Sequence, residues 1–299
     1  MKDRLPSYGG QAVIEGVLMR GKTAVAMATR APNNEIVFHQ EKLSGIYKSN
    51  LLKIPFLRGL IVLWDALSLG MRFLTISANV QTGEDEKLEG PLLYFTLATS
   101  LLIGIGLFFL LPAFISGLIA RYFVINAWMI NLLEGLLRLT LLVSYLWMIG
   151  KIPDIKRVFM YHGAEHKTIN AFEAGADLNA NTVVDYSLEH PRCGTSFILT
   201  LVLFSIILFS LFGPLPFHMR LLSRILMIPV LAGISYEYIH LLAKYSCSPV
   251  VKWLMKPNLA LQKLTTREPS LEMLEVSIEA FKLMFNLENE YDPALIMTI

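Results

Sequence analysis

The chain has 299 residues, of which 54% are apolar and only 17% are charged, and its mean hydropathy is +0.53. A soluble domain of this size carries about a quarter charged residues, so the composition excludes an ordinary soluble domain. It predicts a polytopic α-helical membrane protein whose first partner is the lipid bilayer. The net charge of +2 comes without a clustered basic stripe, so nothing indicates nucleic acid as a partner.

Residues 1–54 are predicted to form a small cytoplasmic β unit. They begin polar and glycine-rich, without the apolar core of a cleavable signal peptide. Short runs rich in Val, Ile and Met then follow, at Gln11–Leu18, Thr23–Thr29 and Glu35–Leu43. We expect a three-stranded meander whose apolar face needs a helix or the membrane surface to cover it.

Residues 55–90 read as an amphipathic helix followed by an acidic linker. Arg58, Asp65 and Arg72 recur every seven residues and so share one face of the helix. A spanning helix would bury that stripe at a cost of several kcal/mol. We therefore favour a helix that lies at the membrane interface, with a spanning helix as the alternative.

Four apolar segments are long enough to cross a bilayer, which takes roughly 20 helical residues. They form two hairpins within residues 91–150 and 197–246, at about Leu92–Ala120, Tyr122–Gly150, Phe197–Gly213 and Leu221–Ala243. Lys and Arg concentrate before the first hairpin, in the loop 151–196 and in the C-terminal helices 247–299. The positive-inside rule therefore places both termini and this loop in the cytoplasm. Both cysteines fall on that side, so a structural disulfide is not expected.

The loop 151–196 contains the most informative motif, His162-Gly163-Ala164-Glu165-His166. It is predicted to lie on a helix from Pro153 to about Ala174, where both imidazoles share one face and can reach one ion. Glu165 is the candidate catalytic residue, because in inverted zincin motifs this glutamate orients or deprotonates a metal-bound water. The motif predicts a divalent metal, most simply zinc. Hydrogen bonding of the imidazoles to carboxylates or lipid headgroups is the alternative.

The predicted topology brings further candidate ligands to the same level of the membrane. Glu173 lies on the motif face, His190 precedes the third span, and Glu237 lies inside the fourth. Glu237 would be far less costly there as a partner of a metal or a histidine. Arg192 and Cys193 lie beside His190, but a cysteine is more often a small buried apolar residue than a ligand.

Two further charged pairs are candidates. Glu134 and Arg138 are four residues apart in the second span, which suits an ion pair that offsets their burial. Glu15 and Arg20 interrupt the first apolar run of the β unit. Either they pair and close a hairpin, or Glu15 completes the central site.

Four segments, in order along the chain, resemble the signatures of the YqhQ-like family of bacterial membrane proteins: Tyr8–Gly21, Tyr161–Lys167, His190–Phe197 and Leu264–Pro269, with Pro257. The resemblance implies a multi-pass protein of the bacterial cytoplasmic (inner) membrane. The family is a domain of unknown function that carries the label of predicted metal-dependent enzyme.

The leading hypothesis is a membrane-embedded metal-dependent hydrolase that acts at the cytoplasmic surface on a peptide or a lipid-linked molecule. A non-catalytic scaffold or assembly factor is the first alternative. Its β unit and its helix after Pro269-Ser270 would bind a protein partner or a second copy of the chain. A lipid- or solute-handling protein that uses Glu134, Arg138 and Glu237 is the second alternative, although four spans without repeats are unusual for a transporter.

Overall fold

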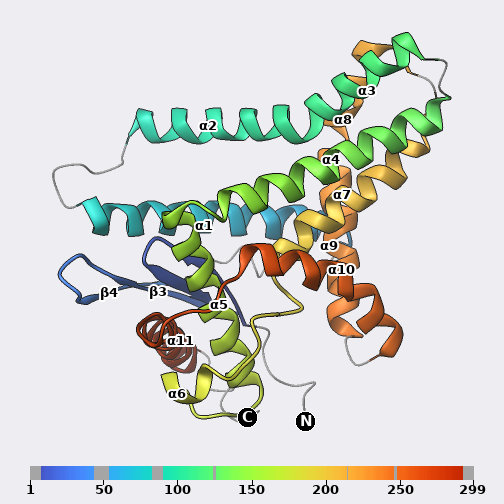
Figure 1. Ribbon diagram of the computed structural model, residues 1–299. Coiled ribbons are helices and arrows are strands. Elements are labelled where there is room, and N and C mark those ends of the chain that lie inside the picture. Colours follow the sequence, from blue (N-terminus) through green and yellow to red (C-terminus); the bar gives the residue numbers. More distant parts are fainter. Residues whose placement is uncertain are drawn as a thin grey trace.

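The computed structural model describes residues 8–43, 54–82, 90–123, 126–213, 215–245 and 248–291. It is mostly helical, with one small antiparallel sheet, and Figure 1 shows the sheet at one end of a bundle of apolar helices. Four strands follow one another in the order β1-β2-β3-β4, with bounds Gly9–Val13, Gly16–Arg20, Ala24–Arg30 and Ile36–Lys42.

The prediction of three strands was wrong at the first strand. A two-residue turn at Ile14 and Glu15 divides it, with Val13 opposite Gly16. Glu15 has a φ of 52°, a left-handed conformation that costs energy for a residue with a side chain. The turn is stabilised from outside, because Thr29 Oγ1 donates to the carbonyl of Ile14 at 2.8 Å. Such a turn lacks the Asn-Gly signal by which hairpins are recognised in a sequence.

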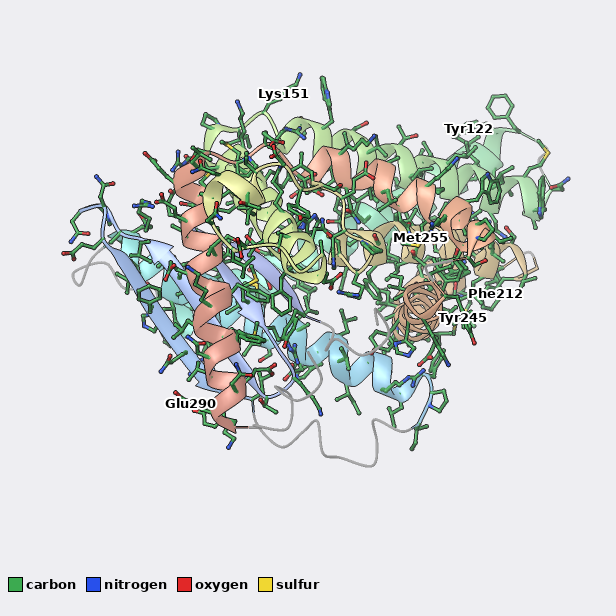
Figure 2. The ribbon with its side chains drawn as sticks, turned by 90° about the horizontal axis from the view of Figure 1, so that it is seen from below. Tyr122, Lys151, Phe212, Tyr245, Met255 and Glu290 are labelled. Carbon is green, nitrogen blue, oxygen red and sulfur yellow. The ribbon has the colours of Figure 1, made fainter. Side chains whose placement is uncertain are left out.

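Both faces of the sheet are covered. One face packs against helices α5 (Pro153–Glu173) and α11 (Leu271–Tyr291), as Figure 2 shows from below. The opposite face packs Leu18, Val25 and Met27 against Phe73 of helix α1, Leu57–Thr82. Because successive side chains of a strand point to opposite faces, this double cover explains why β2 and β3 are almost entirely buried.

Helix α1 is tied to its surroundings by the predicted charged stripe. Asp65 pairs with Arg20 of β2 at 2.8 Å, and Arg72 pairs with Glu41 of β4 at 2.6 Å. Arg58 pairs with Glu237 of helix α9, Ile228–Lys244. Of the two alternatives for Glu15, the pair with Arg20 is contradicted, because Arg20 pairs with Asp65 and Glu15 with Arg157. The stripe links the sheet to the helical bundle.

Within the described part of the chain, three helices are long and apolar enough to cross a membrane: Leu57–Thr82, Leu93–Tyr122 and Ala127–Ile149. The second comprises α2, a π-helical turn η4 and α3, with bounds Pro91–Ile105, Gly106–Leu110 and Leu111–Tyr122, and the third is α4. Helices α8 (Phe217–Leu226) and α9 are bent by 44° and form a fourth candidate as a pair. Helix α7, Gly194–Ser210, is apolar but shorter.

The C-terminal region differs from the prediction in one helix and agrees in the other. The proline pattern of residues 249–257 suggests short helices punctuated by Pro249 and Pro257, but the structure has one continuous helix α10, Pro249–Thr265, with Pro257 inside it. Helix α11 begins after Pro269-Ser270 as predicted. It docks on the sheet through Leu274, Ile278 and Phe281, whereas Leu271 is exposed.

A buried polar network joins the apolar helices. The predicted ion pair is present: Arg138 donates to Glu134 at 2.8 Å. Arg224 of α8, which the sequence analysis did not include, contacts both oxygens of the same carboxylate at 2.8 and 2.7 Å. The side chains of these three residues are 1% exposed. Arg138 also donates to the carbonyl of Phe108 in the π-helical turn.

We expect Glu134→Ala to destabilise the protein by about 3–5 kcal/mol, because two buried guanidinium groups would lose their carboxylate. The triple variant Glu134→Leu/Arg138→Met/Arg224→Met should lose much less, because no charge stays buried. Denaturant unfolding in detergent measures both. Equal losses in the single and the triple variant would contradict a role for unpaired buried charge.

Candidate metal centre

Helix α5 holds the His-x-x-Glu-His motif in its buried second half. Pro153 opens the helix and Gly175, with a φ of 72°, follows its end, so the predicted bounds are confirmed. The residues from Gly163 to Ile169 are buried, because the helix packs both on strand β1 and against its neighbour α11. The motif is therefore part of the packed core and does not lie on a solvated loop.

His162 and His166 point the same way, with ring centroids 4.4 Å apart. The Nδ1 of His162 lies 2.9 Å from the carbonyl oxygen of Thr265, and the Nδ1 of His166 lies 2.6 Å from that of Leu188. A carbonyl only accepts, so each Nδ1 carries the proton and each Nε2 has a free lone pair. Metal-binding histidines are held in this way by their second nitrogen.

The third member of the cluster is Cys193. Its Sγ lies 3.2 Å from the Nε2 of His162, and ligand-capable atoms of Cys193, His162 and His166 all lie within 4.8 Å of one another. The Nε2 of His166 is buried and has no hydrogen-bond partner among the described residues. Cys193 is also the N-cap of α7, where its sulfur accepts a hydrogen bond of 3.4 Å from the Thr195 N–H.

The segment that carries Cys193 is fixed by Gln262 of α10. The Gln262 amide donates to the carbonyl of His190 at 2.8 Å and to the hydroxyl of Ser196 at 3.0 Å, and its oxygen accepts from the His190 N–H at 3.0 Å. Gln262 is fully buried. It therefore holds the chain on both sides of Cys193. This role of Gln262 cannot be predicted from the sequence, because a lone glutamine in an amphipathic helix belongs to no recognisable pattern.

Glu165 lies beside the cluster without belonging to it. Burial raises the pKa of Glu165 from 4.5 to about 7, although the nearby His162 and a hydrogen bond from the Gly10 N–H oppose the rise. Its Oε2 is buried and has no hydrogen-bond partner among the described residues. A Cβ on Gly10 would lie 2.9 Å from the Glu165 Cγ, so strand β1 approaches this closely only because residue 10 is glycine.

The carboxylates predicted as third ligands lie elsewhere. Glu237 is held by Arg58 and by the N–H of Phe56 at 3.0 Å, and it is not part of the cluster found among the described residues. The reason is that the oppositely charged stripe of α1 docks on α9. Glu173 pairs with Arg192 and lies 3.9 Å from the Nε2 of His190.

Neither Glu173 nor His190 belongs to the cluster of three ligand-capable residues found in the described part of the chain. Burial alone would raise the pKa of Glu173, but His190 and Arg192 hold it below its usual value. The ring of His190 lies 5.6 Å from that of His166, as a neighbour.

Glu15 supports the motif helix instead of pairing with Arg20. Its carboxylate accepts two hydrogen bonds of 2.5 Å from Arg157 and one of 3.3 Å from the hydroxyl of Tyr161. Both partners lie on α5, within about one turn and a half of His162. The N-terminal signature therefore reaches the site twice, through Gly10 and through Glu15.

A cavity of about 400 Å³ adjoins the segments that hold the two imidazoles. Leu188, whose carbonyl binds His166, lines it, as does Thr266, the neighbour of Thr265. Two ion pairs lie at its walls, Lys167 with Glu268 at 2.6 Å and Lys263 with Glu189 at 3.4 Å. Charged side chains therefore lie in the wall of the cavity, which borders the segments that hold the two imidazoles.

The chain is thus a mostly helical protein with candidate membrane spans and a largely buried cluster of two histidines and one cysteine. The family model for proteins of unknown function (DUF1385) matches residues 54–287, and the chain belongs to this family. The chain is also 38% identical to the uncharacterized protein YqhQ of Bacillus subtilis (strain 168). The alignment spans 298 residues and covers 95% of this chain and 93% of YqhQ. The resemblance read from the sequence is thus confirmed. No solved structure matches the chain.

The raised pKa of Glu165 predicts a stability effect. Between pH 4.5 and about 7 the unfolded protein releases a proton that the folded protein keeps, so stability falls as the pH rises through this window and is then level. Glu165→Gln should remove this effect. With a chelator present to remove metal, the free energy of unfolding of the variant should exceed that of the wild type by roughly 3 kcal/mol at about pH 8. At about pH 4 the two proteins should have nearly the same free energy of unfolding.

Glu173→Gln is the matched control, because the pKa of Glu173 is lowered and its ionised form stabilises the fold. That variant should be less stable than the wild type at neutral pH. Thermal unfolding across the pH range measures all three proteins. A Glu165→Gln protein that is destabilised at about pH 8 like the control would show that the Glu165 carboxylate is a structural partner.

Proposed function

We propose that this protein is a membrane-embedded, metal-dependent hydrolase that acts at the cytoplasmic surface of the bacterial inner membrane. The observation that carries the proposal is the orientation of His162 and His166. Each imidazole lies against a backbone carbonyl through Nδ1. The Nε2 of His162 lies 3.2 Å from the sulfur of Cys193, the Nε2 of His166 has no partner among the described residues, and ligand-capable atoms of the three residues lie within 4.8 Å of one another. Three preoriented donors, two nitrogens and one sulfur, suit a divalent ion such as zinc.

The number of donors favours catalysis over a structural role. Structural zinc sites use four protein ligands, whereas catalytic sites use three and leave one position open. When bound, such an ion supplies a Lewis acid that activates water near neutral pH. Within the described residues the cluster contains three donors, and the carboxylate of Glu165, whose Oε2 is unpartnered, interacts electrostatically with His162.

Glu165 acts as the general base and then as the general acid. Its Oε2 takes a proton from the attacking water and delivers it to the leaving group. The Gly10 N–H orients the carboxylate, and burial between α5 and β1 limits competing bulk water. Gln262 acts as a positioning residue, because it fixes the segment that carries Cys193.

The packing of the sheet supports the proposed membrane placement. The sheet, α5 and α11 form one unit, so they lie on the same side of any membrane. The helices between the sheet and α5 must then cross an even number of times. If α2–α3 and α4 both cross, α1 does not, and its outer face, with Trp64 75% exposed, lies at the interface.

The alternatives have less support. Helix α11 buries its apolar stripe on the sheet, and both faces of the sheet are covered by helices. Neither the helix nor the sheet therefore presents a free apolar face to a protein partner. The Glu134–Arg138 pair is closed within its own network, which does not suit a solute pathway. The proposed substrates are peptides or lipid-linked molecules that reach the cytoplasmic leaflet. The cavity beside Leu188 would bind a polar part of either substrate.

Glu165→Gln separates an enzyme from a scaffold, because the amide is nearly isosteric but cannot accept the proton. The variant should keep its metal and its fold and lose about 10²-fold or more of its function in complementation of a deletion strain. A His162→Ala/His166→Ala variant should lose the metal as well. Full complementation by a stable, metal-loaded Glu165→Gln protein would exclude the catalytic role.

Reporter fusions test the membrane placement. Fusions after residues 85, 185 and 260 should all report the cytoplasm, and a fusion near residue 216 should report the opposite side, because each hairpin crosses twice. Opposite reports from the fusions after 85 and 185 would mean that an odd number of helices lies between them.

A further inference from the structure

The end of the helical bundle farthest from the sheet has a surplus of positive charge. Residues 91–150 and 194–236 contain one acidic residue, Glu134, and four arginines, which are Arg121, Arg138, Arg220 and Arg224. In the topology proposed above, the connections between the paired helices lie outside the cytoplasm. Basic residues are disfavoured there by the positive-inside rule, so their presence needs another cause.

The carboxylate of Glu134, the one acidic residue of this region, pairs through both oxygens with two of the arginines. Glu134 accepts from Arg138 and from Arg224, and Arg224 also donates to Asn131 at 2.9 Å. Among the described residues, no carboxylate forms an ion pair with Arg121 or Arg220. Within the described part of the chain, the side chain of Arg220 makes no hydrogen bond or ion pair, although it is half-buried. An unpaired guanidinium in apolar surroundings favours an anion from outside the chain.

Arg121 and Arg220 flank one contact between α3 and α8. The Arg121 guanidinium lies 5.5 Å from the centre of the Phe217 ring. A Cβ on Gly117 would lie 3.0 Å from that ring and 3.5 Å from the Nη1 of Arg220. Two forked donors thus lie around the same small residue. Guanidinium forks match the geometry of phosphate oxygens.

The neighbouring side chains place this point at headgroup depth. Tyr122 is 83% exposed, Phe123 63% and Trp128 58%, all at the connection between α3 and α4. Figure 2 shows Tyr122 at the far end of the bundle from the sheet. Exposed aromatic residues of spanning helices gather at the membrane–water interface, where lipid phosphates lie.

We propose that Arg121 and Arg220 bind the phosphate of an anionic phospholipid, and that the Glu134–Arg138–Arg224 network holds α8 in place beneath them. Zwitterionic lipids bind less well, because their cationic headgroup meets the surplus positive charge. The site rests on the membrane placement proposed above and not on the metal centre, so loss of metal or of activity leaves it unaffected.

Lipid binding to the full-length protein in neutral detergent tests this site. Native mass spectrometry should show phosphatidylglycerol retained about tenfold or more better than phosphatidylcholine, and Arg121→Gln/Arg220→Gln should remove most of that preference. Lys151→Gln/Lys156→Gln, which removes two cations near the sheet end, is the matched control and should keep it. Arg220→Lys keeps the charge without the fork and should bind phosphatidylglycerol more weakly than the wild type.

Three results would overturn the proposal. Equal retention of the two lipids by the wild type excludes an anionic-lipid site without reference to any variant. Displacement of phosphatidylglycerol by inorganic phosphate at equal concentration shows a free-phosphate site instead. An equal loss in the lysine control shows that overall charge, and not Arg121 and Arg220, attracts the lipid. If the double variant does not fold, two measurements still test the proposal: lipid binding by Arg220→Lys, and the retention of phosphatidylglycerol relative to phosphatidylcholine by the wild type.

Discussion

The candidate metal centre depends on two hydrogen bonds, those from the Nδ1 groups of His162 and His166 to backbone carbonyls. The accepting carbonyls belong to Thr265, at the end of α10, and Leu188, in the segment before α7. Both bonds form only when three separate parts of the chain dock on one another. They also decide the chemistry, because they leave each Nε2 free to bind a ligand or an ion.

The docking is held by charges that reach across the fold. The stripe on α1 pairs with β2, β4 and α9, and Gln262 binds the chain on both sides of Cys193. The β unit is therefore part of the structure around the site. Its Gly10 contacts Glu165, and Glu15 binds α5 near His162, so the N-terminal segment forms one wall of the site.

Much of this arrangement follows from local sequence pattern. The bounds of α5, the shared face of His162 and His166, and the apolar character of the bundle each depend on residues close together in the chain. The choice of Cys193 over Glu237 does not. It depends on Arg58, nearly 180 residues away from Glu237, which takes that carboxylate. The turn at Ile14 and Glu15 is likewise stabilised by tertiary contacts and lacks the usual turn residues.

X-ray absorption spectroscopy of the zinc-loaded protein tests the central claim most directly, since it counts the atoms bound to the ion. The geometry of His162, His166 and Cys193 predicts one sulfur at about 2.3 Å and two imidazole nitrogens at about 2.0–2.1 Å, with a lighter atom in the fourth position. Cys193→Ser should remove the sulfur and leave both imidazoles. A spectrum without sulfur in the wild type, or one that Cys193→Ser leaves unchanged, would contradict the assignment of this cluster as the metal centre.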